Sequence, residues 1–274
     1  MVSRQAEEIP TGPAKERFVR RLFDAIAPTY DLMNLVLSAG FIRLWHQAFR
    51  RQTRLEPGGT ALDVCTGTGD LALILARQVG PRGRVIGVDL SPAMLALARA
   101  KAQRKGLGEV LVLEQANALA LPYPAGSFDV VSMGFALRNV IDIPAAVREM
   151  ARVVRPGGRV LNLELSKPKS PWVAVPYFFY FYRLVPLIGR LVERKPGRTG
   201  PIRPYTYLPA SLVKFPDQDQ LARYFQEAGL VNVRYYTLTG GIVSLHVGEK
   251  PVQRPGTDEP VLGGSGARPG VRPL

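Results

Sequence analysis

The chain has 274 residues, of which 46% are hydrophobic, enough for one large domain or two small ones around a packed core. Its formal net charge of +14 favours a negatively charged partner, either nucleic acid or an anionic membrane surface, although an ordinary basic surface explains it equally well. The single cysteine, Cys65, excludes an internal disulfide, and the polar N-terminal sequence "MVSRQAEEIPTG" is unlike a secretory signal, so we expect a cytoplasmic protein.

The two ends of the chain differ in composition from the rest. Residues 1–14 and 251–274 are rich in proline, glycine and charged residues, so we predict a flexible N-terminus and a disordered tail. Residues 15–250 are expected to form one domain between them. In its first part, residues 15–55, apolar residues recur at helical spacing and Pro28 can start a second helix. This pattern predicts a helical N-terminal cap.

From Thr60 onward, short β-branched runs alternate with helical patterns. The strand-like runs are "TALDVC", "RVIGVD", "EVLVLEQA", "FDVVSMG" and "GRVLNLEL", and helices are predicted near residues 69–79, 92–105 and 142–153. This alternation is typical of βαβ units, so we predict an α/β fold with a Rossmann-like, doubly wound and mostly parallel sheet. Residues 216–249 then give a helix and two strand-like runs separated at Gly240–Gly241, which predicts an antiparallel hairpin at the sheet edge.

Residues 168–210 interrupt this alternation. The stretch "PWVAVPYFFYFYRLVPLIGRLV" is strongly aromatic and is broken by prolines. It is too interrupted to span a bilayer, which requires about 20 consecutive apolar residues. We interpret it as a lid-like insertion over an apolar ligand, and an ordinary part of the hydrophobic core is the alternative.

A glycine-rich turn follows the first predicted strand. The stretch "LDVCTGTGDLALILA" passes through Gly67, Thr68 and Gly69 into a predicted helix, with the G-x-G-x-x-A spacing of dinucleotide sites. Such a turn lets backbone N–H groups approach a ligand closely. Asp89 ends the second predicted strand, where a carboxylate can accept hydrogen bonds from two ribose hydroxyls. Together these features fit any adenosine-bearing cofactor, NAD included, so a dehydrogenase remains an alternative at this point.

Four further stretches narrow the choice of cofactor: "DLSPAML", "QANALALPYP", "FDVVSMGFALRNV" and "VRPGGRVL". With the turn, they resemble the class I S-adenosylmethionine-dependent methyltransferases, which implies a seven-stranded sheet with an antiparallel hairpin edge. The resemblance implies that Asp63 faces the amino-acid end of the cofactor, that Asp89 holds the ribose, and that Asn117–Ala118 lies at the adenine edge. The full set of implied cofactor-binding residues is Asp63, Gly67, Thr68, Gly69, Asp89, Leu90, Asn117 and Ala118. Cys65 stands where the family's D-x-G-x-G-x-G pattern has its first glycine.

Three longer stretches narrow the family further: "PTYDLMNLVLSAGFIRLW", "RVVRPGGRVLNLELSKP" and "FPDQDQLARYFQEAGLVNVRYYTLTGGIVSLHVGEK". They are similar to the menaquinone and ubiquinone C-methyltransferases of bacterial respiratory-quinone synthesis, over about residues 15–250. One departure is Ile42, where this family commonly has a histidine three residues before the tryptophan, and we interpret it as a position that packs the cap. The resemblance implies C-methylation of a demethylmenaquinol. A benzoquinol of the ubiquinone pathway, or another small aromatic or lipid acceptor, is the alternative.

The chemistry of such a transfer suggests candidate catalytic residues. An aromatic carbon becomes nucleophilic when an adjacent hydroxyl is deprotonated, and it must lie about 3–3.5 Å behind the methyl group. Arg138, just past the fourth predicted strand, is expected to stabilise the naphtholate charge, and Asn139 to orient a hydroxyl or a water molecule. If the cap folds over the site, Tyr30 and Asp31 are candidates for substrate contact and proton acceptance.

Two of these assignments have alternatives. His246, in the last predicted strand, can titrate near neutral pH and could instead be the base, although a lone histidine in a strand is more often a core residue. Arg138 could instead form an ion pair with Asp142, four residues later. We expect no metal, since His46 and His246 are the only histidines and no acidic or cysteine ligands cluster in the sequence.

The predicted substrate also suggests a membrane contact. The isoprenoid tail of a quinol lies in the bilayer, so the aromatic insertion and the positive charge together predict peripheral docking on the anionic inner face of the cell membrane. The residues expected to take part are Trp172, Phe178, Phe179, Phe181, Arg183 and Arg190. A nucleic-acid binding module is disfavoured, because the basic residues are scattered and no strand carries a motif of stacking aromatic residues.

Overall fold

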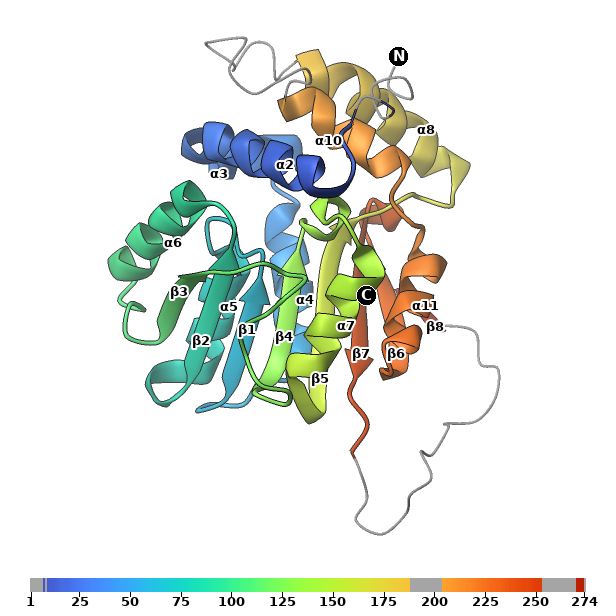
Figure 1. Cartoon of the computed structure of the whole chain (residues 1–274). Coiled ribbons are helices and arrows are strands. Elements are labelled where there is room, and N and C mark those ends of the chain that lie inside the picture. The colour runs from blue at the N-terminus through green and yellow to red at the C-terminus, as the bar shows by residue number, and fades with distance from the viewer. Residues whose placement is uncertain (1–6, 8, 188–203, 253–269, 274) are drawn as a thin grey trace.

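The computed structural model describes residue 7 and residues 9–187, 204–252 and 270–273. These residues contain an eight-stranded sheet in the order β3–β2–β1–β4–β5–β7–β6–β8, with helices on both faces and further helices above one end (Figure 1). The predicted α/β class with a doubly wound, mostly parallel sheet is confirmed. The strands are Thr60–Val64 (β1), Arg84–Asp89 (β2), Leu111–Gln115 (β3), Phe128–Gly134 (β4), Val154–Leu165 (β5), Val231–Leu238 (β6), Val243–Glu249 (β7) and Gly270–Pro273 (β8).

Strand β1 is an inner strand, which pairs in parallel with β2 and β4. Leu62 of β1 lies opposite Ile86 on one side and Val131 on the other. Helices cover both faces here, which explains why β1 is apolar apart from Thr60 at its start and Asp63. The strand order reverses between β1 and β4, since β2 and β3 follow on one side and β5 on the other. Open parallel sheets form a crevice at the carboxyl ends of their strands where the order reverses, so this edge is where a ligand is expected.

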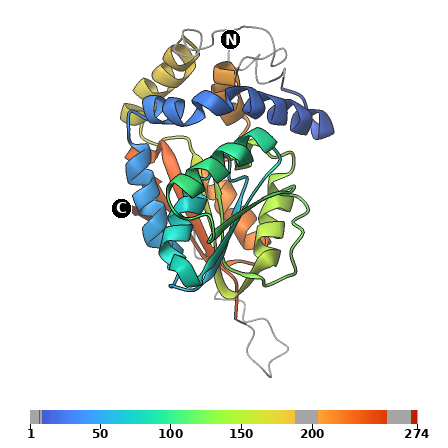
Figure 2. The ribbon, with the colours of Figure 1, turned by 90° about the vertical axis from the view of Figure 1, so that its left-hand side faces the viewer.

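Helices cover both faces of the sheet (Figure 2), and each face has its own hydrophobic core. Phe49, Leu75 and Leu95 belong to one core, and Met150 and Phe225 to the other. The helices on the first face are α4 (Ile42–Thr53), α5 (Asp70–Val79) and α6 (Pro92–Arg104), and those on the second are α7 (Ile143–Val153) and α11 (Gln218–Glu227). The side chains of Ser91, Asp142 and Asp217 cap the N-termini of α6, α7 and α11.

The antiparallel end of the sheet contains the predicted hairpin. Strand β7 pairs in antiparallel fashion with both β5 and β6, and Gly240 has a positive φ of 65° in the turn η5 (Thr239–Gly241) that joins β6 to β7. The structure adds β8, which pairs in parallel with β6, where the sequence predicts a disordered tail. Four residues bounded by glycine and proline carry little strand signal, so the sequence pattern did not indicate this pairing.

The helical cap differs from the prediction at both ends. Helix α2 (Gly12–Ile26) begins three residues before the expected boundary, with Pro13 in its first turn, and continues through η1 (Ala27–Thr29) into α3 (Tyr30–Leu37). Both helices lie across the carboxyl ends of the strands (Figure 1). Helix α4 instead packs on the face of the sheet, where Phe49 is buried against α5 and the strands. The cap proper therefore ends near residue 41.

The insertion forms helices above the cap. They are α8 (Pro171–Phe179), the π-helical turn η4 (Tyr180–Leu184) and α10 (Pro204–Val213) (Figure 1). Tyr177 and Phe181 are buried and stack on each other, whereas Trp172 is 90% exposed. Arg190 lies outside the described residues. Within the described part of the chain, no single helix has the length and apolarity to cross a membrane, and one sharply bent helix pair, Gly12–Leu37 with Ile42–Thr53, meets those criteria on length and composition only.

Candidate active site

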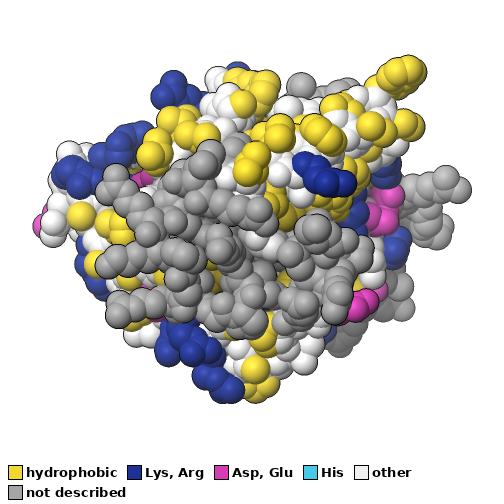
Figure 3. Space-filling view, turned by 90° about the horizontal axis from the view of Figure 1, so that it is seen from above, with side chains coloured by type: hydrophobic (Ala, Val, Ile, Leu, Met, Phe, Trp, Pro, Cys, Tyr) yellow, Lys and Arg dark blue, Asp and Glu magenta, His cyan; other side chains and the backbone are white. Residues whose placement is uncertain are grey.

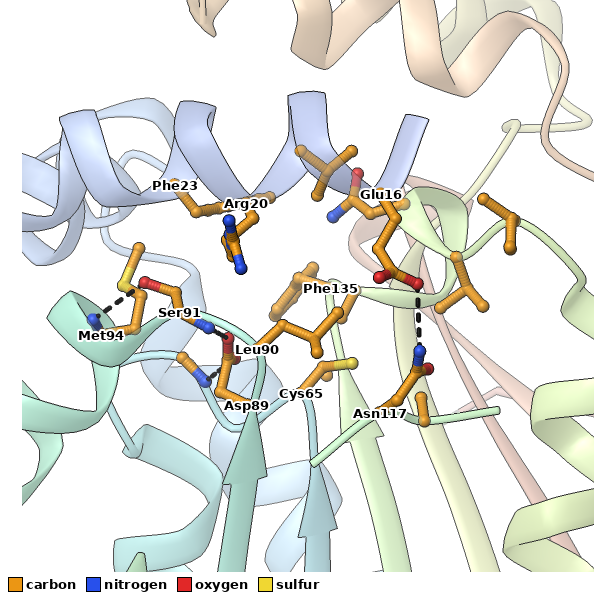
Figure 4. Close-up of a pocket in the computed structure, with 18 of the residues that line it drawn as sticks. Glu16, Arg20, Phe23, Cys65, Asp89, Leu90, Ser91, Met94, Asn117 and Phe135 are labelled. Atoms are coloured by element: carbon orange, nitrogen blue, oxygen red, sulfur yellow. Dashed lines mark hydrogen bonds between the residues drawn. The ribbon is translucent and has the colours of Figure 1, made fainter. Parts of the chain in front are cut away.

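Two cavities adjoin between the strand ends and the helices above them. The first, which we call the α2 cavity, has a volume of about 780 Å³ and is roofed by α2 (Figure 4). The second, the α3 cavity, has about 810 Å³ and is lined by residues of α3, α4 and α10. Phe23, Tyr30 and Phe135 line both cavities, so the two meet at these three aromatic side chains. A smaller space of about 410 Å³, the turn pocket, lies beside the glycine-rich turn.

The glycine-rich turn brings the backbone to these spaces. Cys65, Gly67 and Gly69 all have positive φ angles, of 54°, 56° and 86°. A Cβ on Gly67 would meet no atom within 4 Å, and Gly67 lines both the α2 cavity and the turn pocket. A Cβ on Gly69 would lie 3.1 Å from the Cβ of Ala98. Gly67 therefore leaves room for a ligand, whereas Gly69 lines none of the described cavities and lets α5 pack against α6.

Asp89 holds its carboxylate at the carboxyl end of β2, inside the α2 cavity (Figure 4). One oxygen accepts from the backbone N–H of Gly67 at 2.9 Å and the other from that of Ser91 at 2.8 Å. Burial raises the pKa of Asp89, and these backbone hydrogen bonds oppose the rise. The next residue, Leu90, also lines the cavity. A carboxylate fixed by two backbone donors retains lone pairs for further donors, which suits a ribose diol.

Asp63 lies at the turn pocket, below the α2 cavity. Its two oxygens accept from the hydroxyls of Thr66 and Ser132, both at 2.6 Å. Burial raises the pKa of Asp63 to about 6, against the effect of these hydrogen bonds. Thr68 lines the same pocket. Among the described residues no cationic side chain pairs with Asp63, so this buried carboxylate is suited to pair with a cationic ligand group.

Asn117 and Ala118 follow β3 and line the opposite end of the α2 cavity. The Asn117 side-chain oxygen accepts from the backbone N–H of Leu119 at 2.9 Å, and its Nδ2 donates to a carboxylate oxygen of Glu16 at 3.0 Å (Figure 4). Two hydrogen bonds therefore hold the Asn117 side chain, one to its own loop and one to α2. The α2 cavity therefore has polar groups at both ends and mainly apolar walls between them.

Arg138 lies in η3 (Leu137–Asn139) and lines the α3 cavity. Its guanidinium is buried, pairs with the fully buried Glu164 of β5, and donates to the Phe135 carbonyl at 2.7 Å. Burial raises the pKa of Glu164, and the charge of Arg138 opposes that rise. The alternative ion pair with Asp142 is not formed, because Asp142 instead caps α7 by accepting from the backbone N–H of Ala145.

Asn139 lies beside Arg138 in the sequence but lines the α2 cavity instead. Its side-chain oxygen accepts from the Tyr207 hydroxyl of α10 at 3.0 Å, and Tyr207 itself lines the α3 cavity. The short helix η3 thus places one predicted catalytic side chain in each cavity.

Comparison with known proteins identifies the family to which these features belong. Residues 11–250 match the model of the ubiE/COQ5 methyltransferase family. The chain belongs to this family. It is 46% identical over 241 residues to the "Demethylmenaquinone methyltransferase" of Symbiobacterium thermophilum, a match that covers 88% of this chain and 96% of that protein. It is 43% identical over 236 residues to the "Ubiquinone/menaquinone biosynthesis C-methyltransferase UbiE" of Hahella chejuensis, covering 86% and 92% of the two proteins.

The fold agrees with this membership. A solved S-adenosylmethionine-dependent methyltransferase from Aquifex aeolicus is similar with a TM-score of 0.52 at 19% identity, over 74% of this chain and 88% of that one. The predicted class I methyltransferase fold with its antiparallel hairpin is confirmed, and β8 is an addition to the seven predicted strands. In this ubiE/COQ5 family member, the residues present fit the cofactor that the family and fold imply. Gly67 leaves space beside the backbone, and Asp89 and Asp63 present carboxylates toward that space.

Three other predicted residues of this methyltransferase have different positions relative to the cavities. Tyr30 lines all three spaces, and burial raises its pKa, so its hydroxyl is a donor at neutral pH. Asp31 accepts from the Thr68 hydroxyl at 2.6 Å, pairs with Lys101 at 2.6 Å, and lines none of the described cavities. His246 is buried against the Gln218 carbonyl, and burial lowers its pKa to about 4. His246 is therefore a core residue, and Asp31 holds the cap to the turn.

Sequence reasoning missed two carboxylates, Glu164 and Glu16, and the other residues of α2 that line the site. Glu164 gave a signal in retrospect, an acidic residue within the apolar strand "RVLNLEL". Glu16, Arg20 and Phe23 line the α2 cavity from α2, but at the sequence level they appear only as one face of a helix. Among the described residues, no group of three or more histidine, cysteine or acidic side chains is arranged to hold a metal ion.

Proposed function

We propose that this protein methylates a ring carbon of a demethylmenaquinol with S-adenosylmethionine, forming menaquinol and S-adenosylhomocysteine. The observation that carries the proposal is the junction of two unlike cavities at Phe23, Tyr30 and Phe135. One cavity presents a carboxylate suited to a ribose, and the other is an apolar space suited to an aromatic ring. The printed names of the relatives, demethylmenaquinone and ubiquinone/menaquinone C-methyltransferases, support this assignment.

The cofactor is assigned to the α2 cavity and the turn pocket. Asp89 and Leu90 would hold the ribose, Asp63, Gly67 and Thr68 the amino-acid end, and Asn117 and Ala118 the base. When bound, the cofactor supplies an electrophilic methyl group on a sulfonium, and for this reason the proposed transfer uses no metal. The order follows the sheet edge, from β1 through β2 to β3, so the base extends toward β3.

The acceptor ring is assigned to the α3 cavity. Trp45, Phe135 and Phe181 supply apolar walls there, and Arg138 supplies the positive charge. In this transfer the hydroxyl beside the reacting carbon would give up its proton, and the ring carbon would take the methyl group as the sulfonium carbon–sulfur bond breaks. The methylated carbon would then lose its hydrogen as a proton while the ring oxygen regains one, so that menaquinol, S-adenosylhomocysteine and one proton result. Arg138 would stabilise the ring oxyanion, and its Nε is buried with no hydrogen-bond partner among the described residues. Tyr30 would contact the substrate, and Asn139 would orient a hydroxyl or water.

We further propose that the enzyme is cytoplasmic and contacts the inner face of the cell membrane. Figure 3 shows apolar side chains gathered along the upper face, with basic residues among and beside them. The Tyr180 hydroxyl donates to the Leu37 carbonyl at 3.1 Å, which joins the insertion to the end of α3 beside the α3 cavity. The exposed apolar residues of α3, the α3–α4 corner and the insertion, which we call the upper apolar surface, are Leu32, Leu35, Val36, Phe41, Leu44, Trp172, Val175, Phe179, Leu184 and Leu187.

The residues that we propose to contact the membrane differ from those predicted from the sequence. Trp172, Phe179 and Arg183 are exposed and remain in the proposal. Phe181 is buried and leaves the set, whereas Phe178 is half-buried, stacks on Tyr182 and remains in it.

Two measurements test the proposed function. Quinones extracted from cells that lack the protein should have a mass lower by one methyl group, and the purified chain should restore it with S-adenosylmethionine. The acceptor alternative is tested by comparing turnover of a demethylnaphthoquinol with that of the corresponding benzoquinol. Normal quinone masses in the deleted cells would contradict the proposal.

A further inference from the structure

We propose that Glu16 of α2 accepts a hydrogen bond from the exocyclic amino group of the cofactor's adenine, so that the cap helix is itself part of the cofactor site. The inference rests on the cofactor placement proposed above. It assigns the selection of adenine over other purines to a helix that precedes the methyltransferase sheet in the chain.

Glu16 reaches the cavity from above. In Figure 4 its side chain descends from α2 to the end of the α2 cavity opposite Asp89, where one oxygen accepts from Asn117 Nδ2 at 3.0 Å. Val19, Arg20 and Phe23 line the same cavity from the same helix. Their spacing of three, four and seven residues from Glu16 is that of one helix face. Glu16 therefore belongs to the face of α2 that is turned toward the cavity.

Glu16 offers a charged acceptor at this end of the cavity. The Asn117 side-chain oxygen accepts from the backbone N–H of Leu119, and its Nδ2 donates to Glu16. Glu16 forms no ion pair with any described residue and uses only one of its two oxygens in this hydrogen bond. A carboxylate oxygen accepts readily from an amino group and repels a carbonyl. The end of the cavity nearest β3 therefore selects a base that presents a donor.

The rest of the cap provides a matched comparison. Asp24 of α2 accepts from the Ser91 hydroxyl after β2, and Asp31 of α3 accepts from Thr68 after β1. Neither carboxylate lines the α2 cavity. Lys15 donates to the Val140 carbonyl after β4 at 2.8 Å. The cap is thus tied to the loops after four strands, and among its carboxylates only Glu16 also faces the proposed ligand.

The test is a calorimetric titration of the full chain with S-adenosylhomocysteine and with its 6-oxo analogue, S-inosylhomocysteine. The unmodified chain should prefer the adenosine compound by about tenfold or more, from the strength of a hydrogen bond to a charged group. Glu16→Gln should lose most of this preference, because an amide can donate to the 6-oxo group as well as accept from the 6-amino group. Asp24→Asn removes a cap contact of the same kind without touching the base, so it should retain the preference even if both affinities fall.

The outcomes separate this inference from the function on which it rests. An unchanged preference in Glu16→Gln, or an equal loss of preference in Asp24→Asn, would overturn it. If the amide variant unfolds, Glu16→Asp withdraws the carboxylate by one methylene and should weaken the adenosine compound selectively. Tight binding of the adenosine compound without methylation of any quinol would refute the proposed function and leave the role of Glu16 standing. An unmodified chain that binds neither compound would overturn both.

Discussion

The α2 cavity and the α3 cavity adjoin, yet their walls are of different kinds. In the α2 cavity, Asp89 and Asn117 are fixed by hydrogen bonds to short loops at the sheet edge. In the α3 cavity the walls are aromatic and aliphatic side chains, and Arg138 is the charged member. Polar groups held in advance recognise a hydrogen-bonding ligand, whereas an apolar wall recognises shape and excludes water. The sheet edge is therefore suited to a polar cofactor, and the helices above it to an apolar ring.

The two cavities also differ in the elements that form their walls. The carboxyl-end loops that line the α2 cavity are anchored in a sheet buried on both faces. The α3 cavity is lined by α3, α10 and η4, which come from distant parts of the sequence and lie together above the sheet (Figure 1). The upper apolar surface includes residues of α3 and of the insertion. The contrast can be tested by substitutions that affect one cavity only.

The largest effect is expected for Arg138→Ala. Removing one preorganised donor from a developing oxyanion lowers the chemical rate by about 10²–10³-fold, and Arg138→Lys should recover little, because an ammonium lacks the planar guanidinium. The same change leaves Glu164 buried without its partner, which is expected to cost about 3–5 kcal/mol of unfolding free energy. Single-turnover methyl transfer and denaturant unfolding measure the two effects.

Two further variants separate catalysis from stability in this prediction. Arg138→Met combined with Glu164→Gln removes both charges, so it should regain much of the stability but not the rate. Asp142→Ala removes the α7 cap contact, costs about 1 kcal/mol, and should leave the rate near normal. A near-normal methyl-transfer rate in Arg138→Ala, with reduced stability alone, would assign Arg138 to the scaffold.

The second-largest effect is expected for Asp89→Ala in the α2 cavity. Asp89→Ala should weaken S-adenosylhomocysteine binding about tenfold or more, because two ribose hydroxyls lose a charged acceptor. Asp129→Ala is the matched control, since Asp129 also accepts from a backbone N–H, that of Thr60 at 2.6 Å, but lies at the opposite end of the sheet. Calorimetry on both folded variants should show a loss of affinity for Asp89→Ala only. Unchanged affinity in Asp89→Ala would remove the ribose from this position.

The raised pKa of Asp63 predicts how cofactor affinity depends on pH. Burial raises the pKa of Asp63 to about 6, so below pH 6 the free protein holds this carboxyl protonated. A cationic ammonium favours the carboxylate, so binding must then release a proton, and affinity should fall by up to about tenfold between pH 6 and pH 5. Ser132→Ala removes a hydrogen bond that lowers this pKa and should move the fall to higher pH. Constant affinity from pH 7 to pH 5 would place the ammonium elsewhere.

The sequence predicted more of the residues around the α2 cavity than of those around the α3 cavity, for a physical reason. Gly67, Asp89 and Asn117 each lie at the carboxyl end of a strand or within three residues after it, so a local pattern of strand, turn and helix was enough to place them together. The partner of Arg138 was not predictable in this way. Asp142 is four residues away along the chain, whereas Glu164 is brought beside Arg138 only by the parallel pairing of β4 with β5.

The cap and the insertion were harder still to place from sequence. Helical periodicity predicted that α2 has a buried face, but not that Glu16 on that face meets the loop after β3. Phe181 and Trp172 look equivalent in an aromatic stretch, yet one is buried and the other is 90% exposed. A helix of nearly uniform apolarity has no periodic signal to separate its faces, so only the packing of the described helices distinguishes them.

A smaller effect is expected at the upper apolar surface. Replacing Trp172, Val175 and Phe179 with serine should lower turnover of long-tailed quinols in anionic vesicles several-fold and hardly affect short-tailed ones. Val252→Ser, another exposed apolar residue that lies beyond β7, is the control and should change neither. Vesicle sedimentation measures the binding directly. Equal losses on both kinds of quinol would show that these residues support the fold instead of a bilayer contact.

The smallest effect tests the glycine-rich turn, which lines the α2 cavity and the turn pocket. Cys65 has a φ of 54°, a conformation that costs a residue with a side chain about 1–2 kcal/mol. Cys65→Ala keeps that strain and loses the sulfur contacts, whereas Cys65→Gly loses the same contacts and relieves the strain. The glycine variant should therefore be more stable than the alanine variant by about 1 kcal/mol, even though glycine raises the entropy of the unfolded chain. Elsewhere in a strand or helix the order is reversed, so denaturant unfolding of the two variants is decisive. An alanine variant more stable than the glycine variant would show that the turn imposes no strain at Cys65.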